Sequence, residues 1–309
     1  MWNRMTNTSV NLSGIDLSSP VILASGILDE TPKTLAKVAG FGPGAMVTKS
    51  IGSEPREGNV SPVLIETTDG MLNSMGLPNP GIEEFLKEFD EAEDIATPVI
   101  LSIFGANPEE FATLAQKAQG HGFAGLELNL SCPNAVGVGQ EVGQDPDRVK
   151  DVTKAVKNVS QVPVFVKLTP NISNIVPLAR AAKEGGAEGV VAINTIKGIA
   201  IDHKAKCPVL GNVFGGLSGP AIKPVGLRMV WEIFSAGLDF PIIGCGGIID
   251  HKDVLEYILA GAAAVEVGTA VYYKGPEVLK EITQGLADYM GQEGVEDLGE
   301  LRGLAHRRV

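Results

Sequence analysis

The feature that most constrains the fold of this chain is an alternation of short apolar segments with longer segments of helical character. From residue 99 onward, six apolar segments typical of strands are each followed by a helical segment. They predict strands at 99–103, 125–129, 164–168, 189–193, 242–244 and 264–267, and helices at 108–119, 146–158, 175–184, about 224–236, 251–260 and 276–290. Strands that are apolar throughout are buried on both faces, as in a parallel sheet.

Two earlier apolar segments raise the number of predicted strands to eight. They lie at 21–24 and 45–50, and a predicted helix at 32–39 separates them. Eight strand–helix units in about 250 residues describe a (β/α)8 TIM barrel, which is an α/β fold. The alternative is an open doubly wound sheet, but that fold uses a Gly-x-Gly-x-x-Gly turn after an early strand, and none is present. We find no linker or repeat, so we expect one domain over residues 1–309.

Three segments do not fit the strand–helix repeat. Residues 10–17 alternate apolar and polar side chains around a turn, which predicts a small hairpin. Residues 63–73 predict a second, inserted hairpin, and the prolines that follow it at 73–80 exclude regular structure there. A long insertion separates the strand at 189–193 from the next helix. We expect the inserted hairpin and loops at the C-terminal face of the barrel.

Charge and cysteine content narrow the possible functions. The formal net charge of −12 argues against a nucleic-acid surface, because phosphates are bound by clustered Lys and Arg. The three cysteines, Cys132, Cys207 and Cys245, fit neither a disulfide framework nor a CxxC metal pattern. The four histidines are scattered, so no metal site is expected. With no stretch approaching a membrane span of roughly 18 apolar residues and no apolar leader at the start, we expect a cytoplasmic protein.

Polar residues and glycines end most of the apolar strands. In a TIM barrel the active site is built at the C-terminal ends of the strands, so these residues are expected to surround it. They are Ser25, Gly26, Lys49, Ser50, Ser102, Asn129, Lys167, Asn194, Thr195, Gly246, Gly247, Gly268 and Thr269. The glycines after the last two strands predict a phosphate site, which barrels often place there, and Gly219 could extend it.

The segment 126–134 ends on a thiol between two amides. We interpret Cys132 as the reactive group, and Asn129 and Asn134 as side chains that hold a planar polar ligand. The alternative is a buried cysteine at a strand end, which the polar surroundings of Cys132 disfavour. Glu127, among apolar neighbours, could be a buried carboxylate whose partner the sequence does not reveal.

These motifs resemble those of dihydroorotate dehydrogenase. The resemblance runs from about Val10 to about Met290 and is carried by residues 73–79, 129–134, 194–195 and 217–224 and by the glycines at 246–247 and 268. A cysteine at 132, in place of serine, is similar to the soluble class 1 enzymes. The insertion at 198–217 is similar to that of the class 1B enzymes, the NAD-linked type.

The resemblance implies an FMN cofactor and a dihydroorotate or orotate ligand. It places FMN near Ser25, Lys49, Ser50, Ser102, Asn129, Lys167, Ile193, Gly219, Gly246, Gly247, Gly268 and Thr269. Ser102 departs from the asparagine of many relatives. The pyrimidine would contact Lys49, Asn73, Ser74, Met75, Gly76, Leu77, Asn129, Asn134, Asn194 and Thr195.

The resemblance also implies a mechanism and a partner. Cys132 would take the C5 proton of dihydroorotate while a hydride passes from C6 to the flavin, and Lys167 would stabilise the reduced flavin. A second subunit carrying FAD and a [2Fe–2S] cluster would pass the electrons to NAD, around a homodimeric core in a heterotetramer. This chain has only three cysteines, whereas such a cluster needs four ligands.

Three alternatives stay open from the sequence. A class 1A enzyme would pass its electrons to fumarate. A phosphate-binding barrel lyase or isomerase would form a Schiff base on Lys49 or Lys167. A sensor of flavin or pyrimidine would bind tightly without turnover.

Overall fold

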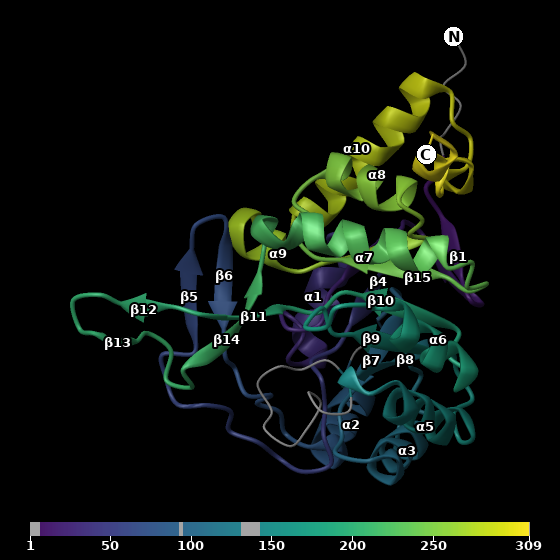
Figure 1. The fold of residues 1–309 in the computed structure, drawn as a ribbon. Coiled ribbons are helices and arrows are strands. Elements are labelled where there is room, and N and C mark those ends of the chain that lie inside the picture. The colour runs from purple at the N-terminus through teal and green to yellow at the C-terminus, as the bar shows by residue number, and fades with distance from the viewer. Residues whose placement is uncertain (1–6, 93–94, 131–142, 309) are drawn as a thin grey trace.

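The structure is a computed structural model that describes residues 7–92, 95–130 and 143–308. Eight parallel strands form a closed barrel in the order β10-β15-β16-β3-β4-β7-β8-β9 (Figure 1). The strands are β3 (Val21–Leu23), β4 (Ala45–Val47), β7 (Val99–Ile103), β8 (Gly125–Asn129), β9 (Val164–Leu168), β10 (Gly189–Ala192), β15 (Ile242–Cys245) and β16 (Ala264–Val267). The predicted TIM barrel is therefore confirmed.

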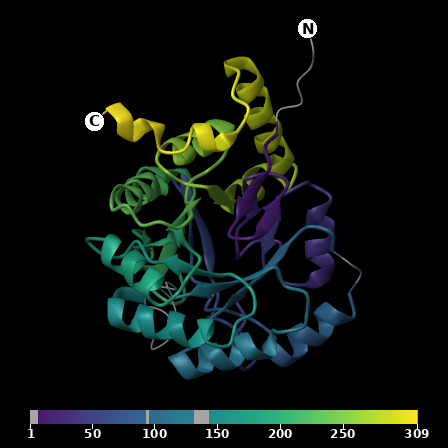
Figure 2. The ribbon, with the colours of Figure 1, turned by 90° about the vertical axis from the view of Figure 1, so that its right-hand side faces the viewer.

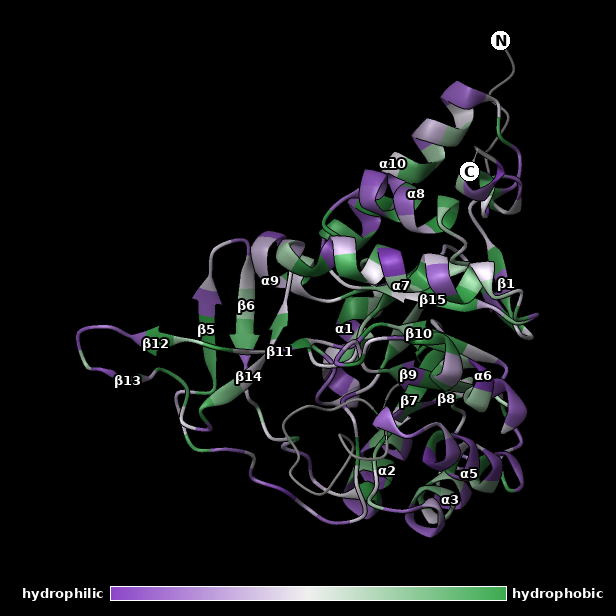
Figure 3. Cartoon of the chain, viewed as in Figure 1, coloured by the Kyte–Doolittle hydropathy of each residue, from purple (hydrophilic) through white to green (hydrophobic). Residues whose placement is uncertain are grey.

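Helices surround the barrel. They are α1 (Pro32–Ala39), α2 (Ile82–Asp90), α3 (Pro108–Lys117), α5 (Pro146–Lys157), α6 (Val176–Glu184), α7 (Lys223–Ser235), α8 (His251–Leu259) and α10 (Val278–Glu293). Side chains such as Asn107 and Asp250 cap their first turns, which satisfies backbone N–H groups that lack helical partners. Figure 3 shows hydrophobic residues in the barrel strands and many hydrophilic residues on the helices. No helix among the described residues is long and apolar enough to cross a membrane.

Among the helices, two differ from the sequence prediction. Helix α2 was not predicted, because the proline-rich segment before it ends at Gly81, whose backbone has φ 82° and offers no capping side chain. Its apolar face, which includes Ile82, Phe85 and Leu86, is nevertheless spaced as in an amphipathic helix. The helix predicted at 276–290 is preceded by a separate short helix, α9 (Thr269–Lys274), and extends to Glu293.

The predicted N-terminal hairpin is present as β1 (Val10–Leu12) and β2 (Ile15–Leu17). Its Leu12, Ile15 and Leu17 are buried against strand residues that include Phe165 and Ile243. Figure 2 shows this hairpin, in purple, within the ring of helices. Side chains alternate along a strand, so Phe165, Ile243 and the other strand residues of this cluster point into the barrel. The residues next to them in the same strands pack against the helices.

Two segments far apart in the sequence build a second sheet beside the barrel (Figure 1). The inserted hairpin, β5 (Leu64–Thr67) and β6 (Gly70–Asn73), joins β14 (Phe214–Ser218) and β11 (Ile196–Ile199) in the antiparallel order β11-β14-β6-β5. The sequence predicted the hairpin but not its partner strands. The remaining elements are β12 (Ile201–Asp202), β13 (Cys207–Pro208) and the 3₁₀ helices η1 (Pro220–Ile222), η2 (Leu298–Glu300) and η3 (Leu304–Arg308).

Candidate active site

A pocket of about 560 Å³ opens at the C-terminal ends of the barrel strands. The ends of seven strands line it (β3, β4, β8, β9, β10, β15 and β16), together with β6 and the segment after β14. Of the residues predicted to bind FMN or pyrimidine, it brings together Ser25, Lys49, Ser50, Asn73, Met75, Gly76, Leu77, Asn129, Lys167, Ile193, Asn194, Thr195, Gly219, Gly246, Gly247, Gly268 and Thr269.

Four of the predicted residues are not among those lining residues. Ser74 is fully buried, and its backbone N–H donates to Val63 O over 2.7 Å. Ser102 is also fully buried and lies behind the wall, where its hydroxyl contacts two other side chains. Cys132 and Asn134 lie outside the described residues, as does the glycine-rich segment 136–140.

Strand alternation explains why the pocket is polar above an apolar base. The lower layer of inward side chains includes Ile100, Phe165 and Ile243, all buried together. Two residues further along the same strands, Ser102, Lys167 and Cys245 occupy the next inward position. The barrel therefore has an apolar core below and a polar layer at its open end.

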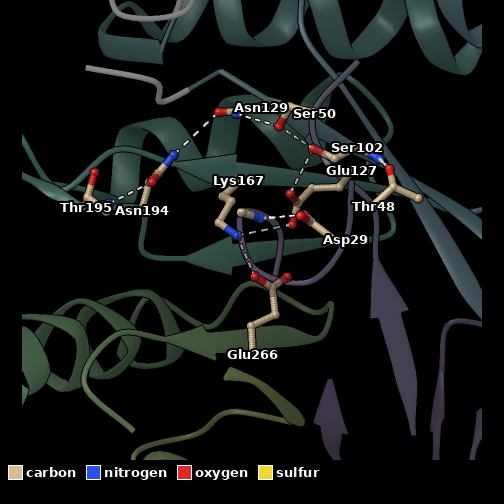
Figure 4. A network of polar contacts seen from close by, with 11 residues as sticks. Asp29, Thr48, Ser50, Ser102, Glu127, Asn129, Lys167, Asn194, Thr195 and Glu266 are labelled. Carbon is tan, nitrogen blue, oxygen red and sulfur yellow. Dashed lines mark hydrogen bonds and ion pairs between the residues drawn. The ribbon is translucent and has the colours of Figure 1, made fainter. Parts of the chain in front are cut away.

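A chain of hydrogen bonds fixes the orientation of the pocket amides (Figure 4). Ser50 Oγ lies 2.9 Å from Ser102 Oγ and accepts a hydrogen bond from Asn129 Nδ2, also over 2.9 Å. Asn194 Nδ2 donates to Asn129 Oδ1 over 3.4 Å, and Asn194 Oδ1 accepts from the Thr195 N–H over 2.7 Å. Amides held in this way can present donors and acceptors to a planar polar ligand.

Three buried ionisable groups form the floor of the pocket (Figure 4). Lys167 Nζ lies 2.5 Å from Glu266 Oε2 and 3.6 Å from Glu127 Oε2. Ser102 Oγ donates to Glu127 Oε1 over 3.2 Å. Burial and the neighbouring Glu266 raise the pKa of Glu127 to about 8, so Glu127 holds a proton at neutral pH. Burial opposes protonation of Lys167, but Glu127 and Glu266 outweigh it and raise the lysine pKa.

Lys49 brings a second positive charge into the pocket. Its side chain lines the cavity, and the residue is only 8% exposed. Within the described part of the chain, its Nζ takes part in no hydrogen bond or ion pair. Because a buried ammonium group without such a partner is costly, Lys49 favours a ligand with an anionic group.

The glycine turn after β15 exposes backbone to the pocket. Gly246 and Gly247 have φ values of 126° and 73°, which favour glycine. A Cβ on Gly247 would lie 2.7 Å from Lys223 N, so the turn packs directly on the start of α7. On its other side, the buried Tyr257 hydroxyl donates to Gly246 O over 2.7 Å. Backbone N–H groups in such a turn can approach a phosphate closely.

Comparison with known proteins assigns the family. A family model described as dihydroorotate dehydrogenase matches residues 7–290. The chain belongs to the dihydroorotate dehydrogenase family. The match covers the range over which the sequence motifs indicated the resemblance.

Similar proteins confirm the predicted resemblance to the class 1B type. "Dihydroorotate dehydrogenase B (NAD(+)), catalytic subunit" of Pyrococcus furiosus is 53% identical over 298 residues, which are 96% of this chain and 98% of that protein. The protein of the same name from Methanocaldococcus jannaschii is 45% identical over 300 residues, or 96% of this chain and 97% of that protein. The structure of the Eimeria tenella dihydroorotate dehydrogenase in complex with ferulenol has a TM-score of 0.85 at 22% identity and covers 98% of this chain and 90% of that one. This last likeness supports the fold alone.

The sequence did not identify all the residues that shape this dihydroorotate dehydrogenase pocket. Glu266 was not singled out, and Glu127 was noted without its partners. Both are acidic residues in barrel strands whose residues are all buried. Because acidic side chains are almost never fully buried unless they are paired, an acidic residue at an inward position of a predicted barrel strand is the signal that could have found them.

Asp29 supports the turn that carries Ser25. Its Oδ2 accepts a hydrogen bond from the Gly26 N–H over 2.5 Å, while its Oδ1 has no hydrogen bond within the described residues. Burial raises the pKa of Asp29 from 3.8 to about 6, against the lowering effects of the Gly26 N–H and Lys49. The ionised form is therefore disfavoured in the folded state. The resulting loss of stability is absent below about pH 3.8 and complete above about pH 6.

We predict that Asp29→Asn removes this pH dependence. Relative to the unsubstituted chain, the variant should gain up to about 3 kcal/mol in free energy of unfolding between pH 4 and pH 7, since one pKa unit corresponds to about 1.4 kcal/mol. Urea unfolding at both pH values measures it. Asp239→Asn, at an exposed position, is the control. If Asp29→Asn and the unsubstituted chain differ in free energy of unfolding by the same amount at pH 4 and at pH 7, the raised pKa of Asp29 is contradicted.

Proposed function

We propose that this chain oxidises dihydroorotate to orotate, a step of de novo pyrimidine biosynthesis, with FMN as its resident cofactor. The observation that carries the proposal is the meeting of Lys49 with Asn73, Asn129 and Asn194 in one pocket. A pyrimidine carboxylate presents one anionic group beside a ring of carbonyl and N–H groups. A cation and several amides are the side chains that recognise these groups together.

The same pocket fits the parts of FMN. We assign the phosphate to the turn at Gly246 and Gly247, because no side chain separates that backbone from the cavity. The residues at the strand ends, Lys167 among them, would hold the flavin ring. When bound, FMN supplies the two-electron redox chemistry, and the protein supplies placement and charge. Ser25, Ser50, Ile193, Gly219, Gly268 and Thr269 would complete its binding site.

We assign the proton transfer to Cys132. In the sequence it follows Asn129 by three positions, and Asn129 ends β8 at the C-terminal face, where barrel chemistry is found. A thiol has an ordinary pKa near 8.5, and its thiolate is a base at mildly alkaline pH. Lys49 would hold the substrate carboxylate, and the amides would orient the ring for removal of the C5 proton.

The floor of the pocket disfavours a Schiff-base lyase or isomerase built on Lys167. A Schiff base forms from a neutral amine, whereas the ionised Glu266, 2.5 Å away, keeps the Lys167 amine protonated. Lys49 is the alternative site for such chemistry. Borohydride trapping of a carbonyl substrate on Lys49 by a colourless chain would support that second function.

We predict that the purified chain is yellow and is bleached by dihydroorotate without oxygen. Cys132→Ala should keep bound FMN but reduce it roughly 10²–10⁴-fold more slowly, the usual effect of losing a general base. Stopped-flow absorbance of the flavin measures the rate. Cys207→Ala is the matched control, because Cys207 is an exposed free thiol outside the pocket. Flavin reduction by Cys132→Ala at the original rate would place the base elsewhere.

We predict that Gly247→Ala weakens FMN binding at least tenfold. The added Cβ would displace the turn from Lys223, and with it the backbone that we assign to the phosphate. Gly237→Ala is the control for backbone strain: Gly237 has φ 64°, its Cβ would meet nothing within 4 Å, and it does not line the pocket. Fluorescence titration with FMN gives both dissociation constants. Equal affinities in the two variants would refute the phosphate assignment.

We propose that a separate subunit with FAD and an iron–sulfur cluster passes the electrons to NAD, around a homodimer of this chain. The proposal is supported by the names of the relatives, which are NAD(+)-type catalytic subunits. A chain with three cysteines lacks the four ligands of an ordinary cluster. We predict that the pure chain oxidises dihydroorotate with artificial acceptors but reduces NAD only with its co-purifying partner. Efficient NAD reduction by the chain alone would refute the partner, and efficient fumarate reduction would indicate class 1A.

A further inference from the structure

Lys167, Glu127 and Glu266 form a cluster at the pocket floor in which the two glutamates hold one proton between them. Lys167 lies between Glu266 and Glu127, and each of the two carboxylates is only 1% exposed. If all three groups were ionised, the cluster would carry one uncompensated negative charge in a site screened from water. Two carboxylates so close to one another do not both ionise readily.

The geometry assigns the proton to Glu127 rather than to Glu266. Glu266 Oε2 is 2.5 Å from Lys167 Nζ, whereas Glu127 Oε2 is 3.6 Å away. Among the described residues, Glu127 Oε2 also has no hydrogen-bond partner. The carboxylate nearer to the ammonium group keeps its charge, and the more distant one stays neutral, in agreement with its raised pKa of about 8.

Among the described residues, Cys245 on β15 interacts with all three groups of this cluster. Burial raises the pKa of Cys245 to about 12, so it stays a neutral thiol below that pH. Ser102 on β7 donates a hydrogen bond to Glu127 and does not titrate in this range. Lys49, after β4, supplies the other positive charge lining the pocket. The charge of the floor therefore depends on the proton of Glu127.

We propose that Glu127 and Glu266 are positioning residues that act on the cofactor through Lys167, by sharing one proton whose loss makes the pocket floor anionic. This inference rests on the proposed function of the pocket. With the proton in place, the cluster is neutral overall and Lys167 presents its charge to the pocket. Once Glu127 releases its proton to solvent, an excess negative charge opposes any further negative charge on a bound flavin. The reduced cofactor should therefore be bound less well at alkaline pH.

The first test detects the proton in the ligand-free chain. Infrared difference spectroscopy should show the carbonyl stretch of a protonated carboxyl group that disappears as the pH rises through about 8. Glu127→Gln should lack this signal. Glu266→Gln should lack it too, because Glu127 then becomes the ionised partner of Lys167. Glu109→Gln, an exposed change on α3, should keep it. Persistence of the signal in Glu127→Gln would overturn the proposal.

The second test measures the midpoint potential of FMN in the loaded chain between pH 6 and pH 10. As Glu127 loses its proton, the midpoint potential of FMN should fall further in the unsubstituted chain than in Glu127→Gln. We expect the ratio of reduced to oxidised FMN affinity to fall at least tenfold, or about 30 mV for a two-electron couple. Glu109→Gln should behave as the unsubstituted chain does. Identical pH profiles in Glu127→Gln and the unsubstituted chain would refute the effect on the cofactor.

The two tests separate this inference from the proposed function. A chain that never binds FMN would refute the proposed function and the effect on the cofactor, while the infrared signal would still report the shared proton. A chain that binds FMN and oxidises dihydroorotate, but shows neither the signal nor the additional fall in potential, would refute the inference alone.

Discussion

The open end of the barrel depends on the burial of one ammonium group, that of Lys167, between Glu266 and Glu127. Taking Lys167 out of water is expensive, and the attraction of the ionised Glu266, 2.5 Å away, must offset that cost. Such a cluster is stable only with close geometry, and removal of one partner leaves an unpaired buried charge. Barrel strands supply the geometry, because β8, β9 and β16 are rigid elements in a closed hydrogen-bonded ring.

The rest of the barrel keeps this cluster in place. Beneath it, the inward side chains are apolar, and the N-terminal hairpin closes the opposite end with Leu12, Ile15 and Leu17. Close packing of that layer resists movement of the strands above it. The serine and asparagine chain from Ser102 to Thr195 then extends the fixed geometry across the pocket. A pocket that grips a planar ring needs this rigidity, because recognition by amides depends on their orientation.

The second sheet adds what the barrel strands do not supply. Asn73 enters the pocket from β6, and its Nδ2 donates to Gly216 O of β14 over 3.3 Å. The insertion after β10 and the hairpin after β4 thus form one wall, although more than 100 residues separate them. The proposed pyrimidine site is therefore shared between the barrel and this sheet, whereas the proposed phosphate site belongs to the barrel alone.

The sequence by itself determined the features that depend on local patterns. Apolar periodicity predicted the eight barrel strands and most helices, and polar strand ends predicted the pocket face. Helix α2 escaped because no capping side chain marks its start at Gly81. Tertiary structure alone decided which charges meet: Lys167 and Glu266 are 99 residues apart, and only closure of the barrel brings β9 and β16 to the same pocket. Local propensity carries no information about such pairs, since their energy arises from shared burial between distant strands.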